Sequence, residues 1–145
     1  MIFANEAETI KFGRRLAAVL GPGDVIALSG PLSAGKTTLV RAMLSALGHP
    51  GEVPSPSFAI VQPYEALDPP VWHVDLYRID DPSEVAELGL EDIGDVGVLV
   101  VEWPEHAGSG AWPNALALSL EAAADGSRAL TAKVPEAWEG RWPLP

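Results

Sequence analysis

The chain has 145 residues, 48% of them hydrophobic, which is the size and apolar content of one globular domain, so we expect a single domain over 1–145. It contains no cysteine, which excludes disulfides and thiolate catalysis, and its formal net charge of −11 would repel RNA, so any action on nucleic acid should pass through a partner. No stretch approaches the roughly 20 apolar residues of a membrane helix and no leader pattern is seen, so we expect no membrane contact and a cytoplasmic protein.

The first third of the chain predicts a helix, a strand and a second helix. Asn5 and Glu8 have the spacing of a capping box, and the apolar stripe after them indicates a helix that stops at the breakers Gly21-Pro22-Gly23. The run 24–29 (DVIALS) is short and apolar, which is typical of a buried parallel strand. A second helix is expected over 36 to about 47, with its apolar residues on one face.

The rest of the chain predicts further strands, a short helix and a hairpin. Strands are expected at 58–64, 71–77 and 96–103, with a short helix over 82–89. The run 96–103 (VGVLVVEW) is apolar almost throughout, so it should be central in the sheet. Alternating segments at 115–121 and 129–134, around an Asp125-Gly126 turn, indicate an antiparallel hairpin at the sheet edge. These elements predict an α/β sandwich with a mainly parallel central sheet and a C-terminal antiparallel hairpin.

The loop between the first strand and the second helix carries a phosphate-binding motif. Residues 30–37 (GPLSAGKT) match G-x-x-x-x-G-K-[ST], and Thr38 follows. Backbone N–H groups of such a loop point at phosphate, and the dipole of the following helix favours negative charge there. Lys36 should reach the β- and γ-phosphates, and the Thr37 hydroxyl is placed to ligate Mg²⁺. A chance match is disfavoured because the motif joins a predicted strand to a predicted helix. The fold class is therefore a three-layer P-loop NTPase-like sandwich.

Glu102 is the candidate acid for holding the metal. A P-loop alone only binds, and hydrolysis also needs an acid that holds metal and a group that orients water. Glu102 ends the most apolar strand, where a buried acid costs several kcal/mol unless it is solvated, paired or bound to metal. We interpret it as the Walker B acid, with Glu where Asp is more usual. The alternative is an acid that simply reaches solvent at a strand end.

Asp75 is a second candidate acid, near the end of another predicted strand in 72–78 (WHVDLYR). It either holds a metal-bound water or acts as a general base, and the alternative is a structural partner for Arg78 or for a loop amide. We favour the hydrolytic role. His73 lies on the same strand face by the period of two, and we interpret it as a hydrogen-bonded core residue without chemistry.

Two more residues have roles that the sequence leaves open. Ser57 lies in 53–58 (VPSPSF), just after the P-loop helix, where switch loops of nucleotide hydrolases lie. It either senses the γ-phosphate or its magnesium, or belongs to a rigid proline turn that enters a strand. Trp103 is a candidate wall of the site, although tryptophan at a strand end is usually core or interface.

The four segments GPLSAGKTT, VPSPSF, HVDLYR and VVEWPE, in this order and spacing, closely resemble the bacterial TsaE (YjeE) family of small P-loop ATPases. The resemblance runs from about Glu6 to His106, and residues from Ala107 onward add little. It implies a role in making the threonylcarbamoyladenosine modification of tRNAs that read codons beginning with A. It also implies that the ATPase works with the TsaB and TsaD proteins, hydrolysing ATP to drive the cycle, and meets tRNA only through these partners.

The resemblance also implies roles for individual residues. The phosphates would be bound by Leu32, Ser33, Ala34, Gly35, Lys36 and Thr37. Thr37 and Glu102 would hold magnesium, Asp75 would be essential for hydrolysis, and Glu6 and Thr9 would lie near the nucleotide base. Ser33 stands where the family usually has Gly, and Ser57 replaces the usual Thr with its hydroxyl kept. Either departure could alter the rate of turnover.

Three other functions compete with the ATPase. A small-molecule P-loop kinase would need an acceptor pocket and usually an arginine-bearing lid, and the scattered arginines disfavour it. A GTPase switch is disfavoured because the sequence has neither an Asn-Lys-x-Asp nor an Asp-x-x-Gly motif. The third is a nucleotide-gated binding module with little turnover, in which ATP orders the 49–57 loop to grip a partner.

Overall fold

The computed structural model describes residues 1–32, 34–51, 53, 60–108 and 110–144, which form one mixed seven-stranded sheet with helices packed on it. The expected α/β class is therefore confirmed. The strands are β1 (Ile2–Phe3), β2 (Val25–Ser29), β3 (Val61–Tyr64), β4 (Val71–Asp75), β5 (Val98–Glu102), β6 (Leu116–Ala122) and β7 (Arg128–Lys133). The helices are α1 (Glu6–Ala17), α2 (Lys36–Ala46) and α3 (Ser83–Ala86), with 3₁₀ turns η1 (Leu90–Asp92), η2 (Pro104–Ala107) and η3 (Glu136–Trp138).

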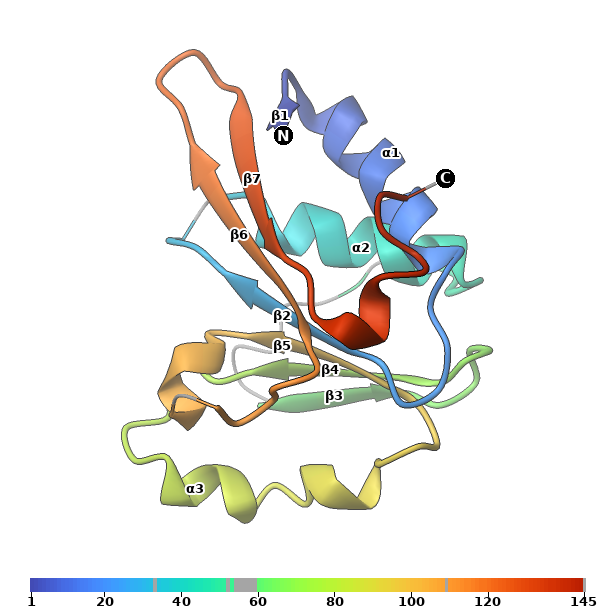
Figure 1. Cartoon of the computed structure of the whole chain (residues 1–145), viewed down its shortest axis with the longest axis vertical. Coiled ribbons are helices and arrows are strands. Elements are labelled where there is room, and N and C mark those ends of the chain that lie inside the picture. Colours follow the sequence, from blue (N-terminus) through green and yellow to red (C-terminus); the bar gives the residue numbers. More distant parts are fainter. Residues whose placement is uncertain (33, 52, 54–59, 109, 145) are drawn as a thin grey trace.

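Four parallel strands form the middle of the sheet. The strand order is β1-β7-β6-β2-β5-β4-β3, and the pairs β6–β2, β2–β5 and β5–β4 are parallel (Figure 1). Strand β5, the run expected to be central, lies between β2 and β4. The remaining pairs are antiparallel, with β3 on one side and β7 and β1 on the other.

The C-terminal hairpin is present but is not at the sheet edge. Strands β6 and β7 pair antiparallel as expected, but β6 also pairs in parallel with β2, and β1 covers β7. The physical reason is the alternation of β6, whose Leu116, Leu118 and Leu120 are fully buried in the main core. This placement brings the hairpin beside the strand that leads into the P-loop.

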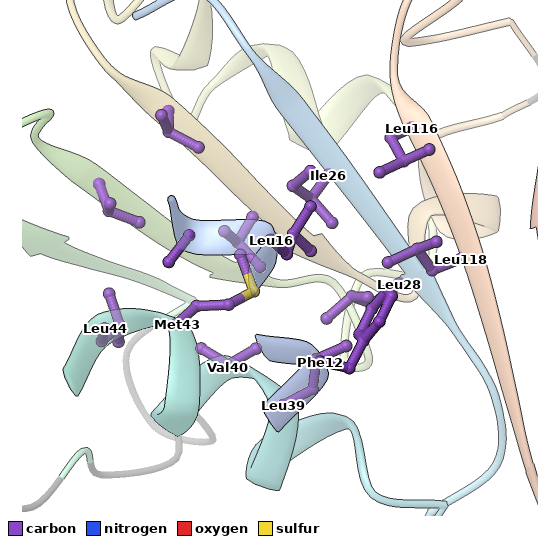
Figure 2. Close-up of a cluster of buried hydrophobic side chains, with 14 of the residues drawn as sticks. Phe12, Leu16, Ile26, Leu28, Leu39, Val40, Met43, Leu44, Leu116 and Leu118 are labelled. Carbon is purple, nitrogen blue, oxygen red and sulfur yellow. The ribbon is translucent and has the colours of Figure 1, made fainter. Parts of the chain in front are cut away.

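The main core lies between the sheet and the pair α1 and α2 (Figure 2). Alternate residues of β2, Ile26 and Leu28, point toward the helices, where Leu16 of α1 and Leu39 of α2 meet them. The helices approach closely at Gly13, where an added Cβ would lie 2.7 Å from the Cβ of Ala42. The close contact of α1 and α2 fixes where α2, and with it the P-loop, begins.

The opposite face of the sheet is covered by the shorter elements α3 and η1. The residues of β5 that face this side, Leu99 and Val101, form a second cluster with Ile79, Leu90 and Ile93. In Figure 1, α3 lies well apart from α1 and α2. Helical elements therefore cover both faces, but the layer over this second face is thinner.

Several element bounds differ from the expected ones by a few residues. Asn5 caps α1 as predicted, because its side chain accepts a hydrogen bond from Glu8 N at 3.1 Å and the Glu8 carboxylate accepts from Ala4 N. The helix nevertheless ends at Ala17 rather than at Gly21, since Val19 N and Leu20 N bond three residues back, as in a tightened last turn. In the described part of the chain, no helix is long and apolar enough to cross a membrane.

Candidate functional site

The phosphate-binding motif lies between β2 and α2, as the sequence predicts. Gly35 is the N-cap of α2 with φ 102°, and Gly30 has φ 141°, both in the region that favours glycine. A Cβ at Gly30 would lie 2.4 Å from the Leu120 carbonyl oxygen, so β6 itself requires glycine there. Among the described residues, no side chain caps the N-terminus of α2 and its first turn holds no acid. The N–H groups of this turn are therefore placed to donate hydrogen bonds to an anion.

Lys36 is buried at the first position of α2, with 5% of its surface exposed. Its Nζ donates a hydrogen bond to Gly30 O at 2.6 Å and lies 4.2 Å from the centre of the Trp103 ring. Burial lowers the pKa of the Lys36 ammonium, while the nearby carboxylates of Glu102, Asp75 and Glu105 raise it. The ammonium thus lies across the loop, between the motif and the two candidate acids.

The two candidate acids lie side by side at the carboxyl ends of adjacent parallel strands. Asp75 of β4 and Glu102 of β5 are register partners, on the sheet face that α2 covers. Glu102 is 5% exposed, so it does not simply emerge into solvent, and its Oε2 lies 2.7 Å from Nε2 of the buried His73. Ligands of open α/β sheets bind at this edge, outside the carboxyl ends of the strands.

Asp75 is half-buried and accepts a hydrogen bond from Tyr77 N at 2.9 Å through Oδ1. The loop amide considered as its structural partner is therefore present. Burial raises the pKa of the Asp75 carboxyl, and this effect outweighs the Tyr77 hydrogen bond, which lowers it; Glu102 raises the pKa as well, whereas His73 and Lys36 lower it. Among the described residues, Oδ1 is the Asp75 oxygen with a hydrogen bond, and a carboxylate with a raised pKa is suited to accept a proton.

A cavity of about 250 Å³ joins these groups. Of the residues that the structure describes, its lining includes Leu32, Ala34, Gly35, Lys36, Thr37, Thr38, Asp75, Glu102, Trp103 and Arg128. Nine of these ten are residues that the sequence analysis singled out. Ser33 and Ser57, the two other predicted residues of this region, lie outside the described residues.

Glu6 and Thr9 lie in an adjoining cavity of about 330 Å³, which also includes Gly35, Thr38 and Arg128. Thr9 is 2% exposed and Glu6 is on the surface of the first turn of α1. The two cavities thus continue one another from the P-loop to the start of α1. The role of Glu6 and Thr9 near a nucleotide base stays a prediction.

Arg128 is the lining residue that sequence reasoning missed. It is the first residue of β7, and a Cβ at Gly35 would lie 3.6 Å from its Nε. Its Nη1 donates to the carbonyl oxygens of Gly126 and Ser127 at 3.0 and 3.2 Å, so the hairpin turn holds the guanidinium over the loop. The available signal was an arginine directly after the predicted Asp125-Gly126 turn. A hairpin placed at the sheet edge would leave that arginine far from the P-loop.

Trp103 lines the cavity that also contains Lys36 and Glu102. It has φ 57°, an uncommon conformation for a residue other than glycine, and its N–H bonds to Leu28 O at 3.2 Å. The ring packs against Tyr77 and His106 at centroid distances of 5.1 and 5.5 Å. The indole thus packs against the second core cluster on one side and lies against the Lys36 ammonium.

The donor set at this edge fits a magnesium ion. Thr37 offers a hydroxyl and Glu102 and Asp75 offer carboxylate oxygens, all lining the same cavity. Mg²⁺ prefers oxygen ligands and usually takes only one or two from the protein, with water and substrate phosphates completing its shell. A larger cavity of about 430 Å³ near α3 is mainly apolar, and Glu91 is the one charged residue among its described lining residues.

The fold and site define a class: an α/β protein with a P-loop sequence and two acids at the carboxyl edge of parallel strands. The family model described as "Threonylcarbamoyl adenosine biosynthesis protein TsaE" matches residues 3–130. The chain therefore belongs to the TsaE family. The match extends past His106, where the recognised motifs end, and includes Arg128.

Curated relatives and a solved structure agree with this assignment. The tRNA threonylcarbamoyladenosine biosynthesis protein TsaE of Haemophilus influenzae is 36% identical over 117 residues, 77% of this chain and 73% of the relative. The proteins of the same name from Bacillus subtilis and Streptomyces coelicolor are 36% and 45% identical, over 88% and 66% of this chain and 80% and 66% of their own lengths. The crystal structure of Bacillus subtilis YdiB superposes with a TM-score of 0.82 at 30% identity, covering 97% of this chain and 88% of that one.

Proposed function

We propose that the chain is a magnesium-dependent ATPase that supports the threonylcarbamoyladenosine modification of tRNA together with TsaB and TsaD proteins. The observation that carries the proposal is the single cavity in which a buried P-loop lysine, Lys36, meets Glu102 and Asp75. The names of the relatives supply the pathway. We further propose that the sheet with helical elements on both faces is a three-layer P-loop NTPase-like sandwich.

In this proposal the phosphates lie against the loop 30–38, whose residues other than Pro31 offer backbone N–H groups. Lys36 leaves the Gly30 carbonyl oxygen and moves its ammonium to the β- and γ-phosphates, which are stronger acceptors. Thr37 and Glu102 would hold Mg²⁺, which neutralises charge on those phosphates when bound. Glu6, Thr9 and Arg128 would line the part of the cavity that takes the base and sugar.

Hydrolysis then needs a water molecule in line with the γ-phosphate. We propose that Asp75 takes a proton from this water through Oδ2, because Oδ1 already accepts from Tyr77 N. The water oxygen bonds to the γ-phosphorus as the bond to the bridging oxygen of ADP breaks, which yields ADP and phosphate. The raised pKa of the Asp75 carboxyl supports the role of base over that of a purely structural acceptor.

Phosphate release in the absence and presence of the TsaB and TsaD proteins tests this function. We expect slow release by the chain alone, acceleration by the two partners, and loss of release in Lys36→Ala and Glu102→Ala. Some nucleotide should remain bound to Glu102→Ala, since the loop amides and Lys36 are intact. Phosphate release that is the same with and without the two partners would contradict the family role. Full turnover by Glu102→Ala would contradict the metal assignment. A phosphorylated acceptor instead of free phosphate would indicate a kinase.

A further inference from the structure

One buried side chain reaches the candidate site from within the sheet and has no role in the function proposed so far. His73 lies on β4, two residues before Asp75 on the same face, and is 1% exposed. The sequence predicts a hydrogen-bonded core histidine at this position. The structure identifies the partner as Glu102, whose Oε2 lies 2.7 Å from Nε2 of His73.

The direction of this hydrogen bond follows from the chemistry of the pair. A carboxylate oxygen can only accept, so Nε2 of His73 carries the hydrogen and donates it to Glu102. The other ring nitrogen, Nδ1, is buried and has no hydrogen bond partner among the described residues. The imidazole therefore has one strong polar contact, and that contact is with the candidate metal ligand.

The strand register explains how the imidazole reaches the carboxylate. On the parallel pair, His73 lies opposite Val100 and Asp75 lies opposite Glu102. The ring of His73 thus starts beside Val100, two residues before Glu102 on the neighbouring strand, and reaches Glu102 from the core side. The ring contacts Oε2, and Glu102 also lines the cavity next to the P-loop.

We propose that His73 is a positioning residue for Glu102. Its Nε2–H holds one carboxylate oxygen, so that the other is presented in a single orientation at the edge of the P-loop cavity. The inference rests on the proposed function, in which Glu102 holds magnesium. Hydrogen bonds to ligating carboxylates orient them, and losing such a partner typically costs about 10–100-fold in metal affinity.

The test compares two substitutions that differ in the donor. His73→Gln can place an amide N–H near the position of Nε2, whereas His73→Leu fills similar space without a donor. Isothermal titration of Mg²⁺ into ADP-loaded protein should show about 10–100-fold weaker magnesium binding for His73→Leu and recovery of most of the loss for His73→Gln. Affinity for ADP without magnesium should stay within about twofold of the parent value in both.

A matched control separates positioning from general loss of packing. Val71→Ala truncates a fully buried residue on the same strand and face and should lower stability without changing the magnesium affinity. A folded His73→Leu that binds magnesium as tightly as the parent would overturn the inference and leave the proposed function standing. An unmodified chain whose ADP affinity does not respond to magnesium would contradict the proposed function itself.

A measurement on the unmodified chain keeps the inference testable if His73→Leu does not fold. Long-range ¹H–¹⁵N correlation spectra of the magnesium-free protein report which ring nitrogen of His73 carries hydrogen. We expect the Nε2–H tautomer, with a chemical shift that changes when Mg²⁺ and ADP are added. An Nδ1–H tautomer would overturn the inference, because a bare Nε2 cannot donate to Glu102.

Discussion

At the scale of single residues, the charges of the site are balanced among a few buried groups. Lys36, Asp75 and Glu102 all line one cavity, and each shifts the pKa of at least one of the others. Burial opposes the charged form of Lys36 and of Asp75, so both groups are held in a state that costs stability. Such groups are typical of functional sites, where a protein gives up stability for chemistry.

Asp75→Asn is therefore expected to unfold at a higher urea concentration than the parent chain at pH 7. The raised pKa means that the folded chain binds this proton more tightly than the unfolded chain, whose carboxyl keeps its ordinary value of 3.8. The stability that this group contributes is present below that pH and is lost as pH rises through the raised pKa. Asparagine cannot ionise and still accepts from Tyr77 N. The extra stability of Asp75→Asn over the parent should become smaller near pH 3.5. Both chains are unfolded in urea without nucleotide and in the presence of a chelator.

Asp81→Asn provides a control of opposite sign, because hydrogen bonds from Ser83 lower the pKa of the exposed Asp81 carboxyl. Asp81→Asn should therefore be less stable than the parent chain at pH 7.

Phosphate release by Asp75→Asn should fall by about 10²–10⁴-fold, the usual contribution of a general base. Undiminished turnover by Asp75→Asn would exclude Asp75 as the base. An Asp75→Asn variant less stable than the parent at pH 7 would show that the hydrogen bonds of Asp75 outweigh its burial.

At the scale of elements, the P-loop depends on helix and strand neighbours that are distant in sequence. Helix α1 packs on α2 through Gly13, and β6 passes so close to Gly30 that only a glycine fits. The hairpin of β6 and β7 then places Arg128 above the loop. The geometry of the loop is thus set by α1, by α2 and by the hairpin together.

Gly13→Ala should destabilise the fold by about 1–3 kcal/mol, although alanine favours helices, because overpacking a tight contact costs this much. The added Cβ would lie 2.7 Å from the Cβ of Ala42 and 3.1 Å from the Leu39 carbonyl oxygen. The double variant Gly13→Ala with Ala42→Gly removes the first clash, so it should lose less than the two single variants added together. Urea unfolding of all four chains gives this coupling. If the stability losses of the two single variants simply add in the double variant, Gly13 and Ala42 are not coupled in the folded chain.

Arg128→Ala should weaken binding of ADP by about 10–100-fold, the effect of losing a charged hydrogen bond. Arg128 lines both connected cavities, and its guanidinium is the one basic group that the hairpin brings to them. Lys133→Ala, at the far end of the same strand and exposed, is the matched control and should leave the affinity unchanged. Equal affinities for the two variants would show that the hairpin does not contact the nucleotide.

At the scale of the whole molecule, the sequence predicts the local features of the site better than its assembly. The P-loop between a strand and a helix and the acids at two strand ends follow from local patterns, because each pattern spans only a few residues. The partner of His73 and the position of Arg128 depend on which strands are neighbours. The hairpin was expected at the edge because its alternating pattern does not reveal that β6 joins β2. Strand order depends on packing over the whole chain, which local periodicity does not record.

In the proposed function, the loop 30–38 binds the phosphates of an adenine nucleotide with the help of magnesium. Isothermal titration of ADP into the chain, with and without Mg²⁺, measures this binding, with Lys36→Ala as the comparison. We expect magnesium to strengthen ADP binding and Lys36→Ala to weaken it by about 10-fold or more, since a charge-assisted contact is lost. No detectable binding, or binding that is the same with and without magnesium and in Lys36→Ala, would contradict it.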